Sequence, residues 1–244
     1  MKIFSGQTAV ITGASSGIGK AIALGLAREG ARLCLVGRNL EALVAVAENA
    51  RRTTNQVQNY RADLAVEEDM KRLTQSLLQD LGHIDLLVHC AGVCSLGEIQ
   101  AAPTKDFDWQ YWINVRAPYA LTQALLPLLK PARGQIVFLN SSVGLSAKAG
   151  IGQYAATKHA LKAIADSLRE EVNPEGLRVL SVFLGRTASP MQAAIHENEG
   201  REYHPERLMK PEDVASVVMN ALSLPRSAEV TDVVVRPLAK LNQT

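Results

Sequence analysis

Tyr154 and Lys158 are the two residues whose types and spacing most directly suggest chemistry in this sequence. They begin the segment YAATKHALKAIADSLREEV, in which steps of four and three residues trace one stripe, as in a helix that faces a core. The same stripe continues through apolar residues, namely Leu161, Ala165, Leu168 and Val172. Because lysine is almost never fully buried without a partner, we predict that the phenol and the ammonium face a functional site and do not form a surface pair.

A hydroxyl group precedes this helix at the end of an apolar run. The run GQIVFLN is followed by SSVG, so that Ser141 and Ser142 lie at the carboxyl end of a predicted strand. A hydroxyl at that place can point into a site and bind a carbonyl or alcohol oxygen. The spacing alone does not choose between the two serines.

A glycine-rich turn near the N-terminus predicts a phosphate site. TGASSGIGKAIALGLAREG follows the first apolar run and places Gly13, Gly17 and Gly19 between a strand and a helix. Glycine permits positive φ and lets a pyrophosphate approach the backbone, and the start of the helix offers free N–H groups. A purely structural turn is the alternative. The other residues that we expect to contact a dinucleotide in this turn are Ser15, Ser16 and Ile18.

The end of the second strand bears on which dinucleotide binds. Selectivity for NAD usually comes from an Asp or Glu there, which binds the ribose 2′-hydroxyl, but this sequence has Gly37 followed by Arg38. A guanidinium matches a 2′-phosphate through parallel hydrogen bonds, so we predict NADP(H) in preference to NAD(H). Asp63 and Leu64, after the third strand, are expected at the adenine pocket, although Asp63 could instead be the N-cap of the next helix.

With a nicotinamide cofactor in place, Tyr154 becomes a candidate general acid/base. The ordinary pKa of tyrosine is about 10, and forming a phenolate near neutrality requires a shift of about 3 units, or about 4 kcal/mol. A unit charge about 4 Å away at an effective dielectric constant near 20 supplies an energy of that order. The Lys158 ammonium and a positively charged nicotinamide ring are the expected sources. In the reductive direction the protonated phenol would donate its proton to the developing alkoxide.

The elements that must position these residues follow from the alternation of patterns along the chain. Short apolar runs near 8–12, 32–37, 57–62, 84–92, 134–140, 177–185 and 231–237 read as strands. Helical patterns lie between them, near 17–29, 39–52, 66–81, 106–130, 153–172 and 211–223. This alternation predicts a doubly wound (Rossmann) three-layer α/β fold with a seven-stranded parallel sheet. Residues 1–244 are expected to form one domain, with Pro118 kinking its helix and a substrate loop near 186–210.

Composition excludes several other classes. Hydrophobic residues make up 47% and charged residues 20% of the 244 residues, and 26 basic against 24 acidic residues give a net charge of +2. We therefore expect no nucleic-acid partner, and the lack of a long apolar stretch predicts no membrane association. Three cysteines (Cys34, Cys90 and Cys94) and five histidines show no metal-ligand spacing, so no metal site is predicted. These features indicate a cytoplasmic protein.

The chain resembles the short-chain dehydrogenase/reductase family of about 250 residues over essentially its whole length. The resemblance is carried by TGASSGIG, ADL, HCAG, NSSVG and YAATK in the family's order and spacing. It implies a tetrad of Asn114, Ser141, Tyr154 and Lys158. Ser141, chosen over Ser142 by the family's S-x-x-G pattern, would polarise the substrate oxygen. Lys158 would bind the nicotinamide ribose and tune Tyr154, and Asn114 would hold a helix carbonyl and a water in a proton relay.

The resemblance also implies further cofactor contacts and two departures from the family pattern. Ala91 and Gly92 remain from the family's N-N-A-G, but His89 and Cys90 replace both asparagines, and a thiol is a weak donor. The family's P-G turn after the sixth strand is Leu184-Gly185 here. Beyond it, Thr187 and Ser189 fall where the family contacts the nicotinamide carboxamide.

The expected reaction is interconversion of a carbonyl and an alcohol on a small or medium, partly apolar substrate. The pocket segments are expected at 93–104, 143–153 and 186–210, with His196 and His204 as exposed lid residues. The family resemblance implies a homodimer or homotetramer, formed by the helices at 106–130 and 153–172, with Ala156, Ala160 and Ala163 allowing close packing.

Two other functions are alternatives to an oxidoreductase. The first is an NADP(H)-binding sensor or scaffold without turnover, which an intact tetrad disfavours. The second is a sugar-nucleotide epimerase or lyase on a related fold. We expect the latter to require an additional C-terminal domain, for which 244 residues leave no room.

Overall fold

The protein is built around one parallel sheet. A computed structural model describes residues 2–238, in which seven parallel strands are ordered β3-β2-β1-β4-β5-β6-β7. The strands are β1 (Thr8–Thr12), β2 (Arg32–Gly37), β3 (Val57–Arg61), β4 (Leu86–His89), β5 (Gln135–Ser141), β6 (Arg178–Leu184) and β7 (Asp232–Val235). The predicted seven-stranded parallel sheet is therefore confirmed.

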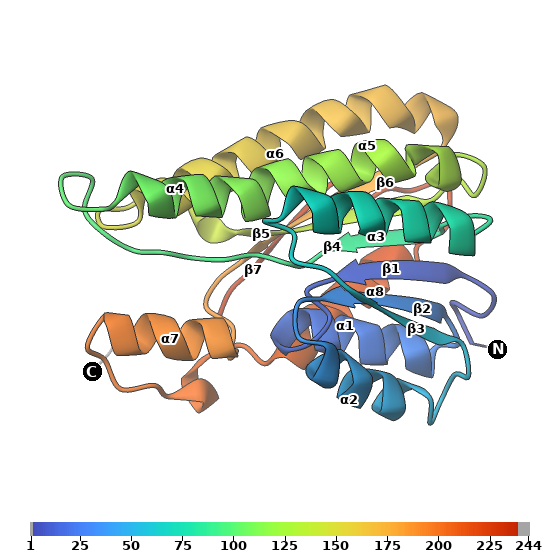
Figure 1. Ribbon diagram of the computed structural model, residues 1–244, viewed down its shortest axis with the longest axis horizontal. Helices are drawn as coiled ribbons and strands as arrows, with labels where there is room; N and C mark the ends of the chain where they lie inside the picture. The colour runs from blue at the N-terminus through green and yellow to red at the C-terminus, as the bar shows by residue number, and fades with distance from the viewer. Residues whose placement is uncertain (1, 239–244) are drawn as a thin grey trace.

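Helices cover both faces of this sheet and make three layers (Figure 1). On one face lie α1 (Gly17–Arg28), α2 (Leu40–Ala50) and α8 (Pro211–Leu222). On the other lie α3 (Glu67–Asp80), α4 (Thr104–Tyr111), α5 (Ala117–Leu129) and α6 (Gly152–Val172). Within residues 2–238, no helix combines the length and the apolarity needed to cross a membrane.

The apolar strand runs supply both halves of the core. Successive side chains of a strand point to opposite faces, so that Val10 packs with one buried cluster and Ile11 with the other. Both side chains are fully buried. Continuous Val/Ile/Leu runs, rather than alternating ones, are what a sheet covered on both faces requires.

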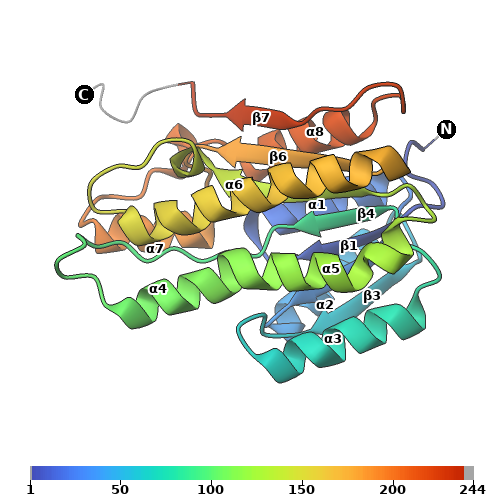
Figure 2. The same ribbon diagram turned by 90° about the horizontal axis from the view of Figure 1, so that it is seen from above.

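The winding of the chain reverses between β1 and β4. β1 pairs with β2 on one side and with β4 on the other, and Thr12 at its end is in register with both Val36 and His89. Open α/β sheets bind ligands outside the carboxyl ends of the strands at such a reversal. Figure 2 shows these ends converging on the side of the molecule where α7 (Pro190–Asn198) lies.

The helix predicted over 106–130 is divided in three. Between α4 and α5 the chain forms a π-helical turn, Trp112–Arg116. Pro118, expected to kink the helix, follows this turn without a break in the helical backbone, and it cannot donate the bond that residue 118 of an α-helix gives to the Asn114 carbonyl. The irregular turn precedes the proline and contains Asn114. π-helical turns of this kind frequently occur at functional sites.

The stretch expected as an irregular loop, 186–210, is partly ordered. It contains α7 and a 3₁₀ turn, Pro205–Arg207. The two ends of this segment are joined by a parallel β-bridge between Thr187 and Met209. Ser189 is the N-cap of α7, and its hydroxyl accepts a hydrogen bond from the Gln192 N–H at 3.2 Å. A loop without secondary structure was therefore a wrong expectation for this segment.

Candidate active site

A cavity of about 280 Å³ lies at the carboxyl ends of the central strands. It brings together most of the predicted cofactor residues, which are Gly13, Ser15, Ser16, Gly17, Ile18, Gly19, Arg38, Asp63, Leu64, Ala91, Gly92 and Ser189. Val93, Pro190 and Met191, from the predicted pocket segments, and Gly37 and Cys90, from the predicted cofactor turns, line it as well, whereas the sequence reasoning missed Val36, Asn39, Ala62 and Ile113. Tyr154, Lys158 and Thr187 are not part of this lining.

The glycine-rich turn leaves the start of α1 open to an anion. The N-cap, Ser16, makes no side-chain cap hydrogen bond, and the first turn holds no acidic residue. Gly13 has a φ of +67°, and a Cβ there would lie 2.8 Å from the Ala91 backbone. Only glycine fits this close approach without strain. An uncapped helix start with free N–H groups suits the pyrophosphate of a dinucleotide.

Arg38 and Asp63 face each other at the edge of the same cavity. Nη1 of Arg38 lies 4.0 Å from Oδ2 of Asp63, and the Arg38 side chain is 60% exposed. The alternative role of Asp63 as a helix N-cap is wrong, because α3 begins after Val66. Asp63 instead closes a turn by accepting a hydrogen bond from the Ala65 N–H at 3.0 Å. The guanidinium is therefore accessible to a ligand at the cavity mouth.

His89 and Cys90, which depart from the family pattern, play different parts. His89 is buried, its ring stacks on Phe138 at a centroid distance of 5.0 Å, and its Nε2 lies 2.8 Å from Thr122 Oγ1. Burial lowers the pKa of His89 to about 3. Cys90 lines the cavity, and its backbone N–H donates to Thr12 Oγ1 at 3.1 Å. The backbone thus ties the end of β4 to β1, whatever the side chain at position 90.

Lys158 is buried, as the stripe predicts, and is only 5% exposed. Its Nζ donates to the Leu139 carbonyl at 3.1 Å and lies 5.8 Å from the centre of the Tyr154 ring. Burial lowers the pKa of this ammonium to about 8. The sequence prediction that both side chains face inward therefore agrees with the structure for Lys158, while Tyr154 is half-buried.

Ser141 caps the 3₁₀ turn Ser142–Gly144, where its Oγ accepts a hydrogen bond from the Val143 N–H at 3.4 Å. Burial raises the pKa of Tyr154 above its usual value, the Cys94 thiol raises it further, and the nearby Ser141 hydroxyl lowers it. Ser142 is exposed, and Ser141 is the serine whose hydroxyl affects the pKa of Tyr154. The protein by itself does not lower the pKa of Tyr154, contrary to what the helix pattern led us to expect from Lys158.

Asn114 joins the segment after β4 to α6. The side chain is 1% exposed. Its Oδ1 accepts from the Val93 N–H and its Nδ2 donates to the Val93 carbonyl, both at 2.8 Å. Nδ2 also donates to Thr157 Oγ1 at 3.1 Å. The carbonyl that it holds therefore lies in the segment after β4 and not in a helix, which corrects the expectation.

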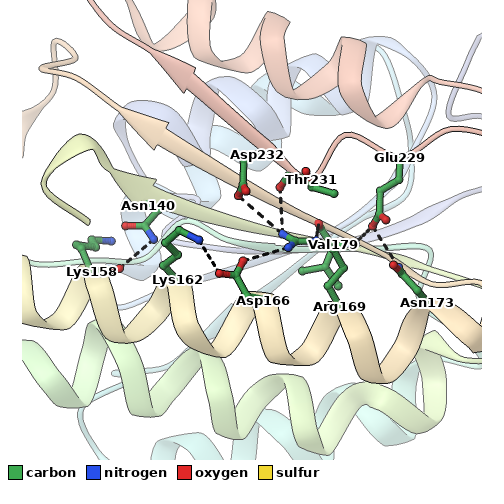
Figure 3. Close-up of polar contacts among 10 residues, drawn as sticks. All are labelled: Asn140, Lys158, Lys162, Asp166, Arg169, Asn173, Val179, Glu229, Thr231 and Asp232. Atoms are coloured by element: carbon green, nitrogen blue, oxygen red, sulfur yellow. Dashed lines mark hydrogen bonds and ion pairs between the residues drawn. The ribbon is translucent and has the colours of Figure 1, made fainter. Parts of the chain in front are cut away.

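The turn of α6 that carries Lys158 is fixed to β5. Asn140 Nδ2 donates to the Lys158 carbonyl at 3.0 Å, as Figure 3 shows. At Gly144 a Cβ would lie 2.9 Å from that same carbonyl oxygen. The glycine of the S-x-x-G pattern is therefore required by the close approach of α6.

The segment 186–210 is held by a cluster of charged and aromatic groups. Arg186 Nη2 contacts both carboxylate oxygens of Glu199, at 2.7 and 3.0 Å. This hydrogen bonding lowers the pKa of Glu199. His196, expected to be exposed, is buried, and its ring packs edge-on against Tyr203. Thr187 is also buried, and its Oγ1 donates to the Gly185 carbonyl at 3.2 Å.

Comparisons with known proteins agree with this architecture. A family model for the short chain dehydrogenases matches residues 7–200. The chain is 33% identical over 233 residues to an uncharacterized oxidoreductase of Staphylococcus epidermidis, covering 95% of this chain and 97% of that protein. It is 32% identical over 240 residues to the glycine betaine reductase ATRR of Emericella nidulans; this match covers 96% of the chain but spans only 19% of that protein's length.

A solved structure gives the same result. A metagenomic short-chain oxidoreductase in complex with NADP superimposes with a TM-score of 0.83 at 30% identity, covering 98% of this chain and all of that one, 100%. The chain belongs to the short chain dehydrogenase family of oxidoreductases.

Proposed function

We propose that the protein is an NADP(H)-dependent oxidoreductase that interconverts a carbonyl and an alcohol on a small or medium, partly apolar substrate. The observation that carries the proposal is the meeting of three groups beside the cavity. Buried Lys158 holds its Nζ 5.8 Å from the centre of the Tyr154 ring, and the Ser141 hydroxyl is near enough to lower the pKa of Tyr154. This is an arrangement for binding an oxygen and passing a proton to it.

The residues of the cavity fit a dinucleotide. The Gly13–Gly19 turn and the uncapped start of α1 would hold the pyrophosphate. Asp63 and Leu64 would border the adenine, while Ala91, Gly92, Thr187 and Ser189 would border the nicotinamide half. Lys158 would bind the ribose hydroxyls beside it. When bound, the cofactor supplies or accepts the hydride.

Tyr154 and Ser141 would handle the proton and the substrate oxygen. Because burial raises the pKa of Tyr154, the phenol holds its proton near neutrality, which is the form needed to protonate a developing alkoxide. Ser141 would orient and polarise the carbonyl oxygen. Asn114 would keep the segment after β4 in place through both of its bonds to Val93. In the oxidative direction a positive charge on the nicotinamide would favour the phenolate.

The preference for NADP(H) rests on Arg38. Its side chain is exposed at the cavity mouth, at the end of β2, where an NAD-selective site usually has a carboxylate. Asp63 approaches only Nη1 of Arg38, at 4.0 Å, and the side chain is 60% exposed, so the guanidinium still has donors for a 2′-phosphate. The similar metagenomic oxidoreductase was solved with NADP, which supports the same choice.

The experiment is a cofactor and substrate survey. Consumption of NADPH is measured against a panel of ketones, aldehydes and quinones, and the dissociation constants of NADPH and NADH are measured for the parent and Arg38→Ala. We expect turnover with at least one panel member and a preference for NADPH that Arg38→Ala removes. Equal affinities for the two cofactors in the parent would refute the cofactor assignment. Tight NADPH binding without turnover on the whole panel would instead favour a sensor or scaffold.

We also propose that residues 186–210 bind the substrate as part of a single catalytic domain, and that the protein is a homodimer or homotetramer. Ala156 and Ala163 lie exposed on α6, where small side chains permit close helix packing. Light scattering of the parent and of Ala163→Glu tests this. The particles of the variant are expected to have a lower molar mass than those of the parent, while an unchanged circular dichroism spectrum shows that the variant is folded. A monomeric parent would contradict the proposal.

A further inference from the structure

Gln110 is a fully buried polar side chain on an otherwise exposed helix. It belongs to α4, and its exposed fraction is 0%. No other residue of that helix, Thr104–Tyr111, is buried. Its Oε1 accepts a hydrogen bond from the Ser95 N–H at 3.0 Å, and its Nε2 donates to Gln153 Oε1 at 3.3 Å. Ser95 belongs to the segment after β4, and Gln153 lies in the first turn of α6. One amide therefore joins the two segments that flank Tyr154.

These contacts repeat, one helical turn away, the contacts of Asn114. Residues four apart lie on the same helix face, and Asn114 likewise bonds the segment after β4, at Val93, and α6, at Thr157. The partners on α6, Gln153 and Thr157, are themselves four residues apart. The residue that follows Gln153 is Tyr154, and the residue that follows Thr157 is Lys158. The two amides thus hold α6 at the positions directly before the two proposed functional side chains.

The start of α6 needs such support. Tyr154 lies in the first turn of the helix, whose N-cap, Ile151, offers no side-chain cap. The first turn of a helix has unpaired N–H groups and frays unless something holds it. Gln153 provides a second attachment there, because its Nε2 donates to the Pro103 carbonyl at 3.0 Å. Gln110 and Gln153 together therefore fix the backbone from which the phenol projects.

From this geometry we propose that Gln110 is a positioning residue for Tyr154 and acts through Gln153. The inference rests on the proposed function, since it concerns the same tyrosine. A small displacement of a reacting group lowers turnover sharply, and a shift of about 1 Å can cost about a hundredfold. Losing the Gln110 contact should therefore lower kcat while leaving NADPH binding, which depends on the other side of the cavity, unchanged.

The test compares Gln110→Met and Gln153→Met with Gln75→Met, an exposed glutamine on α3 that serves as the matched control. Methionine keeps the length of the side chain and removes both hydrogen-bonding groups. We expect both test variants to lose at least tenfold in kcat, with the dissociation constant of NADPH within twofold of the parent. The double variant should lose no more than the worse single variant, because the two residues act through one contact.

Amide hydrogen exchange of residues 152–156 gives a readout that does not depend on turnover. Exchange there should be faster in both test variants and unchanged in the control, because the first turn of α6 has lost its attachment. If Gln110→Met does not fold, Gln153→Met is compared with Gln153→Glu, which keeps an acceptor for Gln110 Nε2 and loses only the donor to the Pro103 carbonyl. A larger loss of kcat in Gln153→Met than in Gln153→Glu then belongs to the Gln110 contact, and equal losses would overturn the positioning role.

The two ways of failing are distinct. Tyr154→Phe is assayed in parallel, and full turnover of that variant would overturn the proposed function itself. If Tyr154→Phe is inactive while Gln110→Met and Gln153→Met keep kcat within twofold of the parent, the positioning role is wrong and the proposed function stands. A further outcome is that a variant melts at a lower temperature while the fraction that binds NADPH keeps the kcat of the parent. That result would show that Gln110 stabilises the fold and does not position Tyr154.

Discussion

The ammonium of Lys158 donates a hydrogen bond to the carbonyl of Leu139, at 3.1 Å, and so ties α6 to β5. The Lys158 side chain, which the sequence pattern predicted to face the core, is thus bound to the sheet near the carboxyl end of β5. This places a cation beside the cavity proposed to bind a dinucleotide, whose phosphates are negative.

The charge of Lys158 should make NADPH binding depend on pH. Because burial lowers the pKa of this group to about 8, its positive charge is present below that pH and is lost as the pH rises through it. Affinity for NADPH should therefore fall between pH 7 and 9.5. Fluorescence titrations should show this fall in the parent and in Lys162→Met, the control on the same helix, and a flat profile in Lys158→Met. Equal pH profiles in all three proteins would contradict the assignment.

His89 should make the fold sensitive to acid. Its pKa is lowered by burial to about 3, whereas an unfolded histidine has a pKa of about 6.5. Between these values the unfolded chain binds the proton and the folded protein does not, so stability falls as the pH drops, by up to about 1.4 kcal/mol per pH unit. Urea unfolding from pH 7 to 4 measures the slope.

A variant separates this histidine from the other titrating groups. His89→Phe keeps an aromatic ring against Phe138 and cannot titrate, so its loss of stability between pH 6.5 and 4 should be clearly smaller than the parent's. His159→Gln replaces an exposed histidine and should retain the parent's slope. The same slope in His89→Phe as in the parent would show that His89 is not the source.

Arg169 should be a stabilising residue remote from the chemistry. Its guanidinium donates to the carbonyls of Val179 and Thr231, at 3.0 and 3.1 Å, and joins α6 to β6 and the start of β7 (Figure 3). Arg169→Met leaves two carbonyls without these donors, at a cost of about 2 to 4 kcal/mol in the free energy of unfolding. Urea denaturation measures it.

Lys162→Met is the comparison for that experiment, because Lys162 pairs with Asp166 on the same helix but is more exposed. Its loss should stay below about 1 kcal/mol. Should both variants unfold at the same urea concentration, the network in Figure 3 would not contribute as described.

Gly13 should tolerate no side chain. A Cβ at this position would lie 2.8 Å from the Ala91 backbone, and φ is positive. Gly13→Ala should therefore weaken NADPH binding at least tenfold and lower the melting temperature. Gly82→Ala, where a Cβ would meet no atom within 4 Å, is the control and should change neither. Unimpaired NADPH binding by Gly13→Ala would show that the cofactor does not depend on this turn.

The sequence predicted the sheet well because its five central strands are largely apolar runs between helical patterns, while the edge strands β3 and β7, which are less buried, were found from their place in the alternation. It also predicted that Lys158 is buried, since lysine interrupts an apolar stripe. α7 was missed because its apolar pattern is weak, although Ser189 followed by Pro190 is a signal for a helix start. That signal could have identified α7.

Gln110 and the π-helical turn could not be predicted in the same way. A glutamine in a polar helix is ordinarily an exposed residue, and this one is buried only because segments distant in sequence fold against it. The change from α- to π-helical bonding around Asn114 accompanies Pro118, which lacks the N–H that an α-helix directs at the Asn114 carbonyl, but the proline pattern predicted only a kink. The buried His196 was predicted to be exposed, because its partners Arg186 and Tyr203 meet it only in the folded segment.

The central claim is that the Tyr154 phenol transfers the proton. It is tested most directly by rapid-mixing measurement of NADPH oxidation in Tyr154→Phe with a carbonyl substrate of the parent. We predict that the variant binds NADPH with a dissociation constant within about twofold of the parent and oxidises it at least about a hundredfold more slowly, as expected for loss of a general acid. Oxidation at the parent's rate by this variant would contradict the claim.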